Sequence, residues 1–173
     1  MVTLCFDEIR TPLGDLVAIA NSASVLTHLL FAAQIDQRSA FAHVRRLATT
    51  RSAAPFVRLR RQLQAYFDGQ ALAFTVAMAP QGTAFEHQVW GALAQIKPGA
   101  TKTYGDLARA LGQPNAARAV GAANGRNPIS VLIPCHRLLG ANGALTGYAG
   151  GLAAKRWLLH HEAALHPGDA ARG

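Results

Sequence analysis

Cys135, His136 and Arg137 stand next to one another in the stretch IPCHRLLG, residues 133–140. Together they offer a thiol, a titratable imidazole and a fixed positive charge, and the deprotonated thiol is the form that acts as a nucleophile. The apolar residues VLI at 131–133 predict a strand, and LLG at the end of the stretch predicts a buried turn. We therefore expect the three side chains at the boundary of a hydrophobic core, where burial is unfavourable unless the groups have a chemical task.

Residues adjacent in sequence do not face one another on a strand or a helix, so His136 is not placed to take the proton of Cys135 directly. A bridging water is the more natural relay. A base of this kind commonly needs a third group to orient it, and Glu162 is the candidate. It lies one helical turn beyond Leu158 in the predicted helix LAAKRWLLHHEAAL. The alternatives are a buried structural thiol at Cys135 and an ordinary surface carboxylate at Glu162.

A run of short helices after residue 82 must position these groups. Thr83 at an N-cap and Glu86 three residues later predict a capping box. The predicted helices YGDLARAL and NAARAVGAAN follow, joined by a short turn that contains glycine and proline. Two short helices joined in this way form a helix-turn-helix pattern, which favours DNA binding only weakly when it stands alone.

The second helix of this pair carries mostly alanine and glycine, with Arg118 as its one long charged residue. A helix that reads base edges in the major groove needs several Arg, Asn or Gln side chains. Small side chains instead allow close approach, so the pattern indicates a helix pressed into the minor groove with Arg118 inserted into the base stack. The alternative is an alanine-packed core helix with one solvated arginine.

The first part of the chain predicts a separate α/β domain. Strands are expected at residues 2–6, 16–20, 25–31 and 71–78, and a helical pattern runs from about residue 40 to 69. The turn APQGT after residue 78 marks a boundary. The predicted domains are therefore residues 1–80 and 82–165, with residues 166–173 as a frayed tail.

The composition of the 173 residues, half of them hydrophobic and 15% charged, predicts a well-formed core. The formal net charge of +8 makes nucleic acid the first partner to consider, against the alternative that the arginines only solubilise the surface. Two cysteines can form neither a disulfide framework nor a cysteine-rich zinc site. With no signal peptide and no apolar run long enough to span a bilayer, we expect a cytoplasmic protein without membrane association.

Residues 82–162 closely resemble the O6-alkylguanine-DNA alkyltransferases, also called methylated-DNA–protein-cysteine methyltransferases. The resemblance rests on the P-C-H-R core, the preceding N-P, the G-Y-x-G-G and the terminal glutamate of the stretch RAVGAANGRNPISVLIPCHRLLGANGALTGYAGGLAAKRWLLHHE. The N-terminal part is similar more loosely, through TPLGDL and LQAYFDG. The family implies an α/β (α+β) protein, in which a ribonuclease H-like domain precedes a mainly helical, winged helix-turn-helix domain.

The resemblance implies a role for each matching residue. Cys135 would be the alkyl acceptor, His136, a water and Glu162 its activating relay, and Arg137 a structural residue. Tyr104 would help to rotate the nucleotide and donate to the guanine. The remaining residues that the resemblance implies are the DNA-binding Arg118, Ala117 and Gly121, and the pocket and hinge residues Asn127, Leu138, Tyr148, Ala149 and Gly150. Ala149 departs from those members that have serine there, which should change substrate tolerance rather than abolish the reaction.

The implied function is DNA repair. The protein would extrude O6-alkylguanine, and O4-alkylthymine as well, from double-stranded DNA through the minor groove. It would transfer the alkyl group irreversibly to Cys135, once per molecule, as a monomer, with clustering of molecules on DNA left open. No cofactor is expected, and Cys5, His28 and His87 are an incomplete set for the structural zinc site of some members.

Three other classes of function fit the sequence less well. A non-catalytic sensor of alkylated DNA is the main alternative, and Cys135 argues against it because such sensors lack the cysteine. A thiol hydrolase would need turnover and a carbonyl substrate. A transcription regulator of the larger adaptive-response type would need a multi-cysteine zinc domain, for which this chain has no room.

Overall fold

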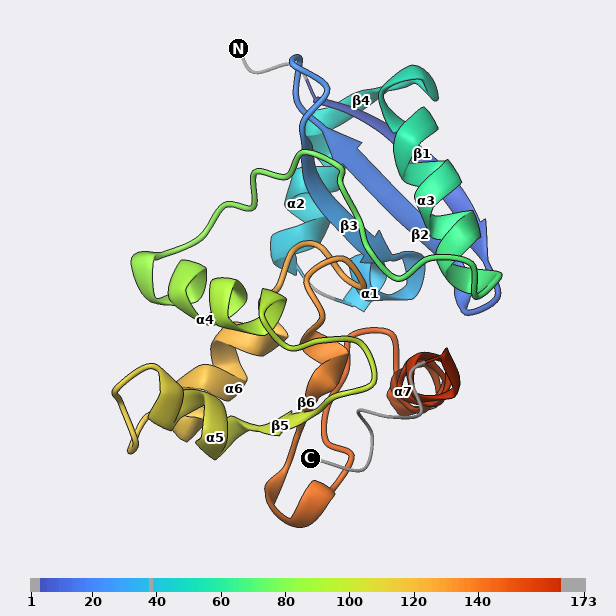
Figure 1. The fold of residues 1–173 in the computed structure, drawn as a ribbon. Coiled ribbons are helices and arrows are strands. Elements are labelled where there is room, and N and C mark those ends of the chain that lie inside the picture. Colours follow the sequence, from blue (N-terminus) through green and yellow to red (C-terminus); the bar gives the residue numbers. More distant parts are fainter. Residues whose placement is uncertain (1–3, 38, 166–173) are drawn as a thin grey trace. The chain divides into compact units, whose positions relative to one another are not determined.

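The computed structural model describes residues 4–37 and 39–165, and the chain divides into two compact units (Figure 1). The first unit comprises Met1–Gln81 and Pro128–Ser130, and the second comprises Gly82–Asn127 and Val131–Gly173. The tail predicted to be frayed, residues 166–173, lies outside the described residues. The chain thus leaves the first unit, returns to it for one short segment, and completes the second unit afterwards.

A four-stranded sheet forms the centre of the first unit. Its strands, in the order β3-β2-β1-β4, are β1 (Leu4–Thr11), β2 (Gly14–Ala20), β3 (Leu26–Phe31) and β4 (Ala48–Arg51). The first three strands form an antiparallel meander, whereas β4 pairs parallel with β1. The tight turn between β1 and β2 places Gly14 at φ 105°, a left-handed conformation that glycine adopts without a steric clash of Cβ.

Helices pack against both faces of this sheet. On one face, α1 (Ala32–Gln37) and α2 (Ser39–Leu47) supply Ile35 and Phe41 to a core that includes Phe6 of β1. Successive strand residues point to opposite faces, so Asp7 points to the other face. There it binds Arg60 of α3 (Val57–Phe67), the helix that follows the 3-10 helix Ala54–Phe56.

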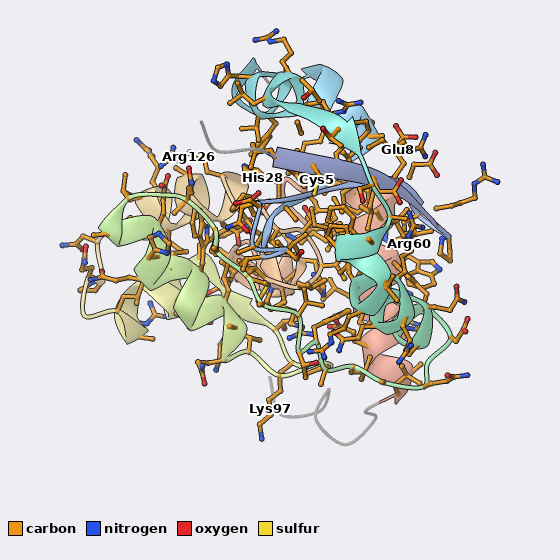
Figure 2. All side chains as sticks on the ribbon, turned by 90° about the horizontal axis from the view of Figure 1, so that it is seen from above. Cys5, Glu8, His28, Arg60, Lys97 and Arg126 are labelled. Atoms are coloured by element: carbon orange, nitrogen blue, oxygen red, sulfur yellow. The ribbon has the colours of Figure 1, made fainter. Side chains whose placement is uncertain are left out.

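Asp7 is the carboxylate that the described part of the first unit buries. Arg51 of β4 donates to its Oδ1 at 3.0 Å, and Arg60 binds Oδ2. Arg60 also donates to the main-chain oxygen of Glu8 at 2.8 Å, and both of these residues are labelled in Figure 2. Burial would raise the pKa of Asp7, but the hydrogen bonds from Arg60 and Arg51 together hold it below its usual value. Because both arginines reach solvent, this ion cluster lies at the rim of the unit.

Two elements of the first unit differ from the sequence prediction. Residues 71–78 form no strand, although Met78 makes a single bridge to Leu26. The helical pattern expected from residue 40 to 69 is interrupted by β4, where the residues ATTR pair with the free edge of β1. Strand formation depends on a neighbouring edge as much as on the local residues, and the sequence does not specify that edge.

Short helices make up most of the second unit. They are α4 (Ala84–Ala94), α5 (Tyr104–Ala110), α6 (Ala117–Gly125) and α7 (Leu152–Leu165). Two short strands, β5 (Lys102–Thr103) and β6 (Leu138–Leu139), pair in parallel. Helix α6 packs against α4 and α5, and the indole nitrogen of Trp90 donates to the main-chain oxygen of Ala123 at 3.0 Å. Within the described ranges, no helix is both long enough and apolar enough to cross a bilayer.

Capping boxes begin two of these helices. The predicted box at Thr83 and Glu86 is confirmed, with each side chain bound to the backbone N–H of the other residue. A second box, which the sequence analysis did not identify, pairs Thr103 with Asp106 at the start of α5. The backbone hydrogen bond from Thr103 is the largest cause that lowers the pKa of Asp106 to about 2. This box fixes Tyr104 as the first residue of α5.

The segment before Cys135 is not the strand that its apolar residues predict. Residues 131–133 are buried and form a turn, and Val131 has φ 71°, which is rare for a β-branched residue. Asn127 donates from its side-chain amide to the main-chain oxygen of Ile133 at 2.9 Å, which closes this turn. The LLG segment also differs, because Leu138–Leu139 forms β6 rather than a turn.

Candidate functional site

Cys135 begins a short 3-10 helix, Cys135–Arg137, whose three side chains are all buried. The backbone N–H of Cys135 donates to Ile133 at 2.8 Å and that of Arg137 to Pro134 at 3.0 Å, so the turn is closed on itself. The side-chain amide of Asn124, on α6, donates to the main-chain oxygen of Cys135 at 3.4 Å. The thiol therefore stands on a tightly held turn that is linked to α6.

His136, Arg137 and Glu162 form one buried cluster. Nε2 of His136 lies 2.9 Å from Oε1 of Glu162. Arg137 donates through Nε to Oε2 and through Nη2 to Oε1, both at 2.8 Å, which is a bidentate pair. Arg137 also donates to the main-chain oxygen of Ile96. Glu162 is thereby fixed by Arg137, and it fixes the ring of His136.

The electrostatics of this cluster define the tautomer of His136. Burial lowers the pKa of His136 more than Glu162 raises it, and the charges of Arg137 and Lys155 lower it further. Burial would raise the pKa of Glu162, but hydrogen bonds from His136 and Arg137 outweigh it and hold that pKa far below its usual value. Nε2 of His136 faces the carboxylate of Glu162, so the neutral imidazole carries its proton on Nε2 and donates it to that carboxylate. Nδ1 is left as an acceptor.

Nδ1 of His136 is buried and has no hydrogen-bond partner among the described residues. Tyr148 lies nearby, with its ring edge-on to the imidazole at a centroid distance of 6.3 Å. A buried acceptor without a partner is rare in native proteins and calls for an explanation such as an ordered water. The structure thus brings Cys135, His136, Glu162 and Tyr148 into one region, as the sequence analysis expected of them.

Lys155 is a member of this region that the sequence analysis missed. It lies on the buried face of α7 with Leu158 and Glu162, and its side chain is 0% exposed. Its Nζ donates to the main-chain oxygen of Thr146 at 2.9 Å. In the sequence it precedes Arg156 and reads as one of two surface cations. The spacing of seven residues to Glu162, which keeps both on one helix face, was the available signal.

An open cleft of about 780 Å³ lies beside α5 and α6, and its lining is rich in predicted DNA-binding residues. Its lining includes Tyr104, Ala117, Arg118 and Gly121 from the prediction, together with Asn142, which was not predicted. The ring of Tyr104 would lie 3.7 Å from a Cβ added at Gly121, so a small residue there leaves room for the tyrosine. Small residues of α6 therefore border the cleft together with two long cations, Arg118 of α6 and Arg109 of α5.

The loop before α7 connects this cleft with the buried cluster. Thr146 donates from its hydroxyl to the phenolic oxygen of Tyr104 at 3.3 Å, while its main-chain oxygen accepts from Lys155. Ala149 and Gly150, predicted to belong to the substrate pocket, follow Tyr148 and are half buried. Tyr104 and the loop of residues 146–150 are thus held together.

Leu138 and Asn127 occupy supporting positions. Leu138 is fully buried in β6 and pairs with Lys102 of β5, directly after the 3-10 helix. Asn127 closes the turn before Cys135 and lies two residues beyond α6. Both residues therefore tie the cysteine turn to the elements around it.

Among the described residues, no three His, Cys, Asp or Glu side chains lie close enough together to hold a metal ion. Cys5 and His28 lie in the first unit, on the strands β1 and β3 that flank β2 (Figure 2). His87 lies on α4 of the second unit, where its ring packs edge-on against Trp90.

Comparison with protein families gives two matches that together follow the two units. The family described as "6-O-methylguanine DNA methyltransferase, ribonuclease-like domain" matches residues 6–80. The family described as "6-O-methylguanine DNA methyltransferase, DNA binding domain" matches residues 84–164.

Named relatives and a solved structure agree with these matches. A methylated-DNA–protein-cysteine methyltransferase of Methanosarcina acetivorans is 56% identical over 59% of this chain, and the alignment covers 65% of that protein, slightly less than two thirds. A protein of the same name from Mycobacterium bovis is 44% identical over 95% of both chains. A crystal structure of Mycobacterium tuberculosis OGT in complex with DNA superposes with a TM-score of 0.82 at 41% identity, covering 95% of this chain and 96% of that one.

Proposed function

The chain belongs to the 6-O-methylguanine DNA methyltransferase family, and we propose that it repairs DNA by moving an alkyl group from guanine O6 to the sulfur of Cys135. The family resemblance and the α/β class predicted from the sequence are confirmed by these matches. The observation that carries the assignment of Cys135 is its place beside a buried His136–Glu162 pair, in which Nδ1 of His136 has no hydrogen-bond partner within residues 4–37 and 39–165.

The arrangement supports activation of the thiol through one water. Because His136 is neutral with Nε2 bound to Glu162, its Nδ1 can accept a proton from a water that Cys135 protonates. Glu162 then stabilises the imidazolium, and Arg137 holds Glu162 in place. Arg137 acts through Glu162 and does not touch the substrate.

The transfer is a displacement at the alkyl carbon. The thiolate forms a sulfur–carbon bond, the bond from carbon to O6 breaks, and its electron pair leaves with the guanine, which is then protonated. Tyr104 serves as the donor that stabilises charge on the departing base. The product is a thioether, which water does not readily cleave, so each molecule reacts once.

The cleft beside α6 supports DNA as the substrate, bound through the minor groove. Small residues on α6 allow close approach to the groove, and Arg118 fills the space of the extruded nucleotide, in agreement with its place in the cleft lining. A relative, Mycobacterium tuberculosis OGT, has been crystallised with DNA. The loop with Tyr148, Ala149 and Gly150 closes the guanine pocket, main-chain groups near Leu138 read the base edge, and Asn127 acts as the hinge.

Further parts of the proposal concern the whole protein. Residues 1–80 form a supporting α/β domain, and residues 82–165 form the winged helix-turn-helix domain that binds DNA and accepts the alkyl group. The protein works as a monomer in the cytoplasm, needs no metal or cofactor, and also accepts O4-alkylthymine. Its net charge of +8 favours association with DNA.

The decisive experiment is incubation with duplex DNA that contains O6-methylguanine, followed by peptide mass analysis. We expect the Cys135 peptide to gain one methylene mass, with at most one equivalent per protein, and Cys135→Ser to gain nothing. Cys5→Ser is the matched control and should react as the unsubstituted chain does. Binding of damaged DNA without modification would favour a lesion sensor, and many repaired lesions per molecule would contradict the proposal.

Two further substitutions separate DNA handling from chemistry. Arg118→Ala should slow repair of duplex DNA by roughly tenfold to a hundredfold, since filling the base stack offsets a few kcal/mol of unstacking. Its reaction with the free base O6-benzylguanine should change little, and equal losses on both substrates would remove the extrusion role. Glu162→Gln should slow alkylation of Cys135 with little change in DNA affinity.

A further inference from the structure

Lys155 is a buried cation whose position the proposed relay does not explain. Its side chain is fully buried, and among the described residues it forms no ion pair with a carboxylate. In the part of the chain that the structure describes, its side chain donates one hydrogen bond, to the main-chain oxygen of Thr146. A buried ammonium with a single neutral partner is strongly unfavourable unless an anion lies near it.

Cys135 is the candidate for that anion, because it lies in the turn against which α7 packs. Helix α7 packs against the 3-10 helix Cys135–Arg137, and Lys155 and Glu162 lie on the same buried face of α7, two turns apart. Burial lowers the pKa of Lys155, and the one group whose charge raises it is Cys135. The charge of Lys155 also reaches His136, whose pKa it lowers.

The titratable groups around Lys155 can therefore be named. They are Cys135 and His136 in the 3-10 helix, Glu162 on α7 itself, and Tyr104 of α5, which is reached through the loop residue that Lys155 binds. Glu162 is already engaged by the imidazole and a guanidinium. The thiolate of Cys135 is the anion left for Lys155 to pair with.

We propose that Lys155 is the counter-ion of the Cys135 thiolate, and that alkylation removes its anion and leaves the ammonium buried without one. This inference rests on the proposed function, since it takes Cys135 as the alkyl acceptor. In the transfer, the sulfur loses its negative charge to the new sulfur–carbon bond and the guanine takes up one proton. The proton that the guanine takes up is the one that passed from the thiol to His136, so the transfer balances without Lys155. With its anion gone, the buried ammonium of Lys155 is disfavoured, and the repaired state favours release of its proton to solvent.

The first test measures the reactivity of Cys135 without DNA, in a Cys5→Ser protein that has one thiol. Iodoacetamide alkylates the thiolate with loss of iodide, and its rate against pH gives the midpoint of thiolate formation. Lys155→Met should move this midpoint up by about one pH unit or more, because an opposite charge is lost. Arg156→Met, the exposed neighbour on α7, is the control and should move it by less than about 0.3 units because its charge is screened.

An unchanged midpoint in folded Lys155→Met would overturn the proposal, even if DNA repair itself were demonstrated. Conversely, failure of the repair assay with a shifted midpoint would refute the proposed function and leave the ion pair standing. Methionine is chosen since a buried charge is often replaced by an apolar side chain of similar volume without loss of folding.

A second test keeps Lys155 and caps the thiol of the Cys5→Ser protein with methyl methanethiosulfonate, which leaves a neutral sulfur. Once the thiol is capped, Lys155 has no anion and its pKa falls further below that of the unfolded chain, so the stability of the capped protein rises with pH up to about 10.4. In the uncapped protein the thiolate pairs with Lys155. Above about pH 8.5 the thiol of the unfolded chain is ionised too, so the free energy of unfolding of the uncapped protein rises little with pH there. The capped protein should be less stable than the uncapped one. The difference in Tm between the two should narrow by roughly 4 °C from pH 8.5 to 10. A constant gap would contradict the proposal.

Discussion

The two units of the molecule differ in how deeply they bury their most enclosed ion pair. The first unit buries the carboxylate of Asp7 at its rim, against Arg51 and Arg60, whose side chains are 63% and 37% exposed. The second unit buries Glu162 and Arg137 together, with side chains 1% and 8% exposed. An ion pair that keeps solvent contact serves to join elements, whereas one withdrawn from water is unfavourable unless it is fully hydrogen-bonded. The second unit buries such a pair directly beside the turn that carries Cys135, and the described part of the first unit has no counterpart to it.

The largest effect should come from Glu162→Gln. Removing this anion leaves the buried Arg137 without a counter-ion, which should lower the free energy of unfolding of the second unit by about 3–5 kcal/mol. Tryptophan fluorescence in urea measures it directly, since both tryptophans, Trp90 and Trp157, belong to the second unit. Asp7→Asn is the counterpart in the first unit and should cost about 1 kcal/mol, because its arginines reach solvent. Equal losses of unfolding free energy from Glu162→Gln and Asp7→Asn would show that the two units do not differ in this respect.

An acid effect of about 3 kcal/mol is expected in the first unit from His28. Burial lowers the pKa of His28 to about 4. As pH falls below about 6.5, the unfolded chain binds this proton first, so stability is lost between about pH 6.5 and 4. Hydrogen exchange of the β1–β3 amides at pH 7 and pH 4 should show the loss, and His28→Leu should reduce it. The exposed His43→Leu is the control, and an equal reduction there would exclude His28 as the cause.

A smaller effect tests local rather than buried interactions in the second unit. Thr103→Ala removes the capping box with Asp106 and should cost about 1 kcal/mol by urea unfolding followed by fluorescence. Thr83→Ala, at the matching position of α4, should behave alike. Losses as large as that of Glu162→Gln would show that burial of charge is not what distinguishes the site.

The smallest effect should come from Arg10→Ala in the first unit. Arg10 and Asp15 are 3.9 Å apart with side chains 93% and 51% exposed, so the pair should contribute less than about 0.5 kcal/mol. Hydrogen exchange of the β1–β2 amides gives the measurement. If Arg10→Ala lowered the free energy of unfolding by about as much as Asp7→Asn, the contribution of an ion pair in this protein would not depend on its exposure.

The sequence predicts a structural feature well when that feature depends only on residues a few positions apart. The capping box at Thr83 needs only residues three apart, and it forms as predicted. The predicted helix placed Glu162 one turn beyond Leu158, and in the structure both side chains lie on the buried face of α7. Family resemblance added the fold class, because its motifs extend over residues 82–162.

Long-range pairing set the limit of prediction. The residues ATTR form β4 only because β1 offers an edge to pair with. Residues 71–78 find no such edge and form no strand. The apolar residues 131–133 turn instead of extending, because Asn127 closes the segment and Val131 takes a left-handed conformation. Lys155 resembles a surface lysine in sequence, and only the packing of α7 shows that it is buried.

The short segment Pro128–Ser130 has a consequence for synthesis of the protein. Its backbone binds Leu29 of β3 from both sides, with hydrogen bonds of 2.8 Å to Pro128 and from Ser130. Domains generally fold during translation as soon as their residues emerge. Here the meander must wait for residue 130, so the ribosome has already released most of the DNA-binding unit before the N-terminal sheet gains its last hydrogen bonds. A single proteolytic cut or early stop near residue 81 would therefore deliver an N-terminal fragment with an unfinished β-edge.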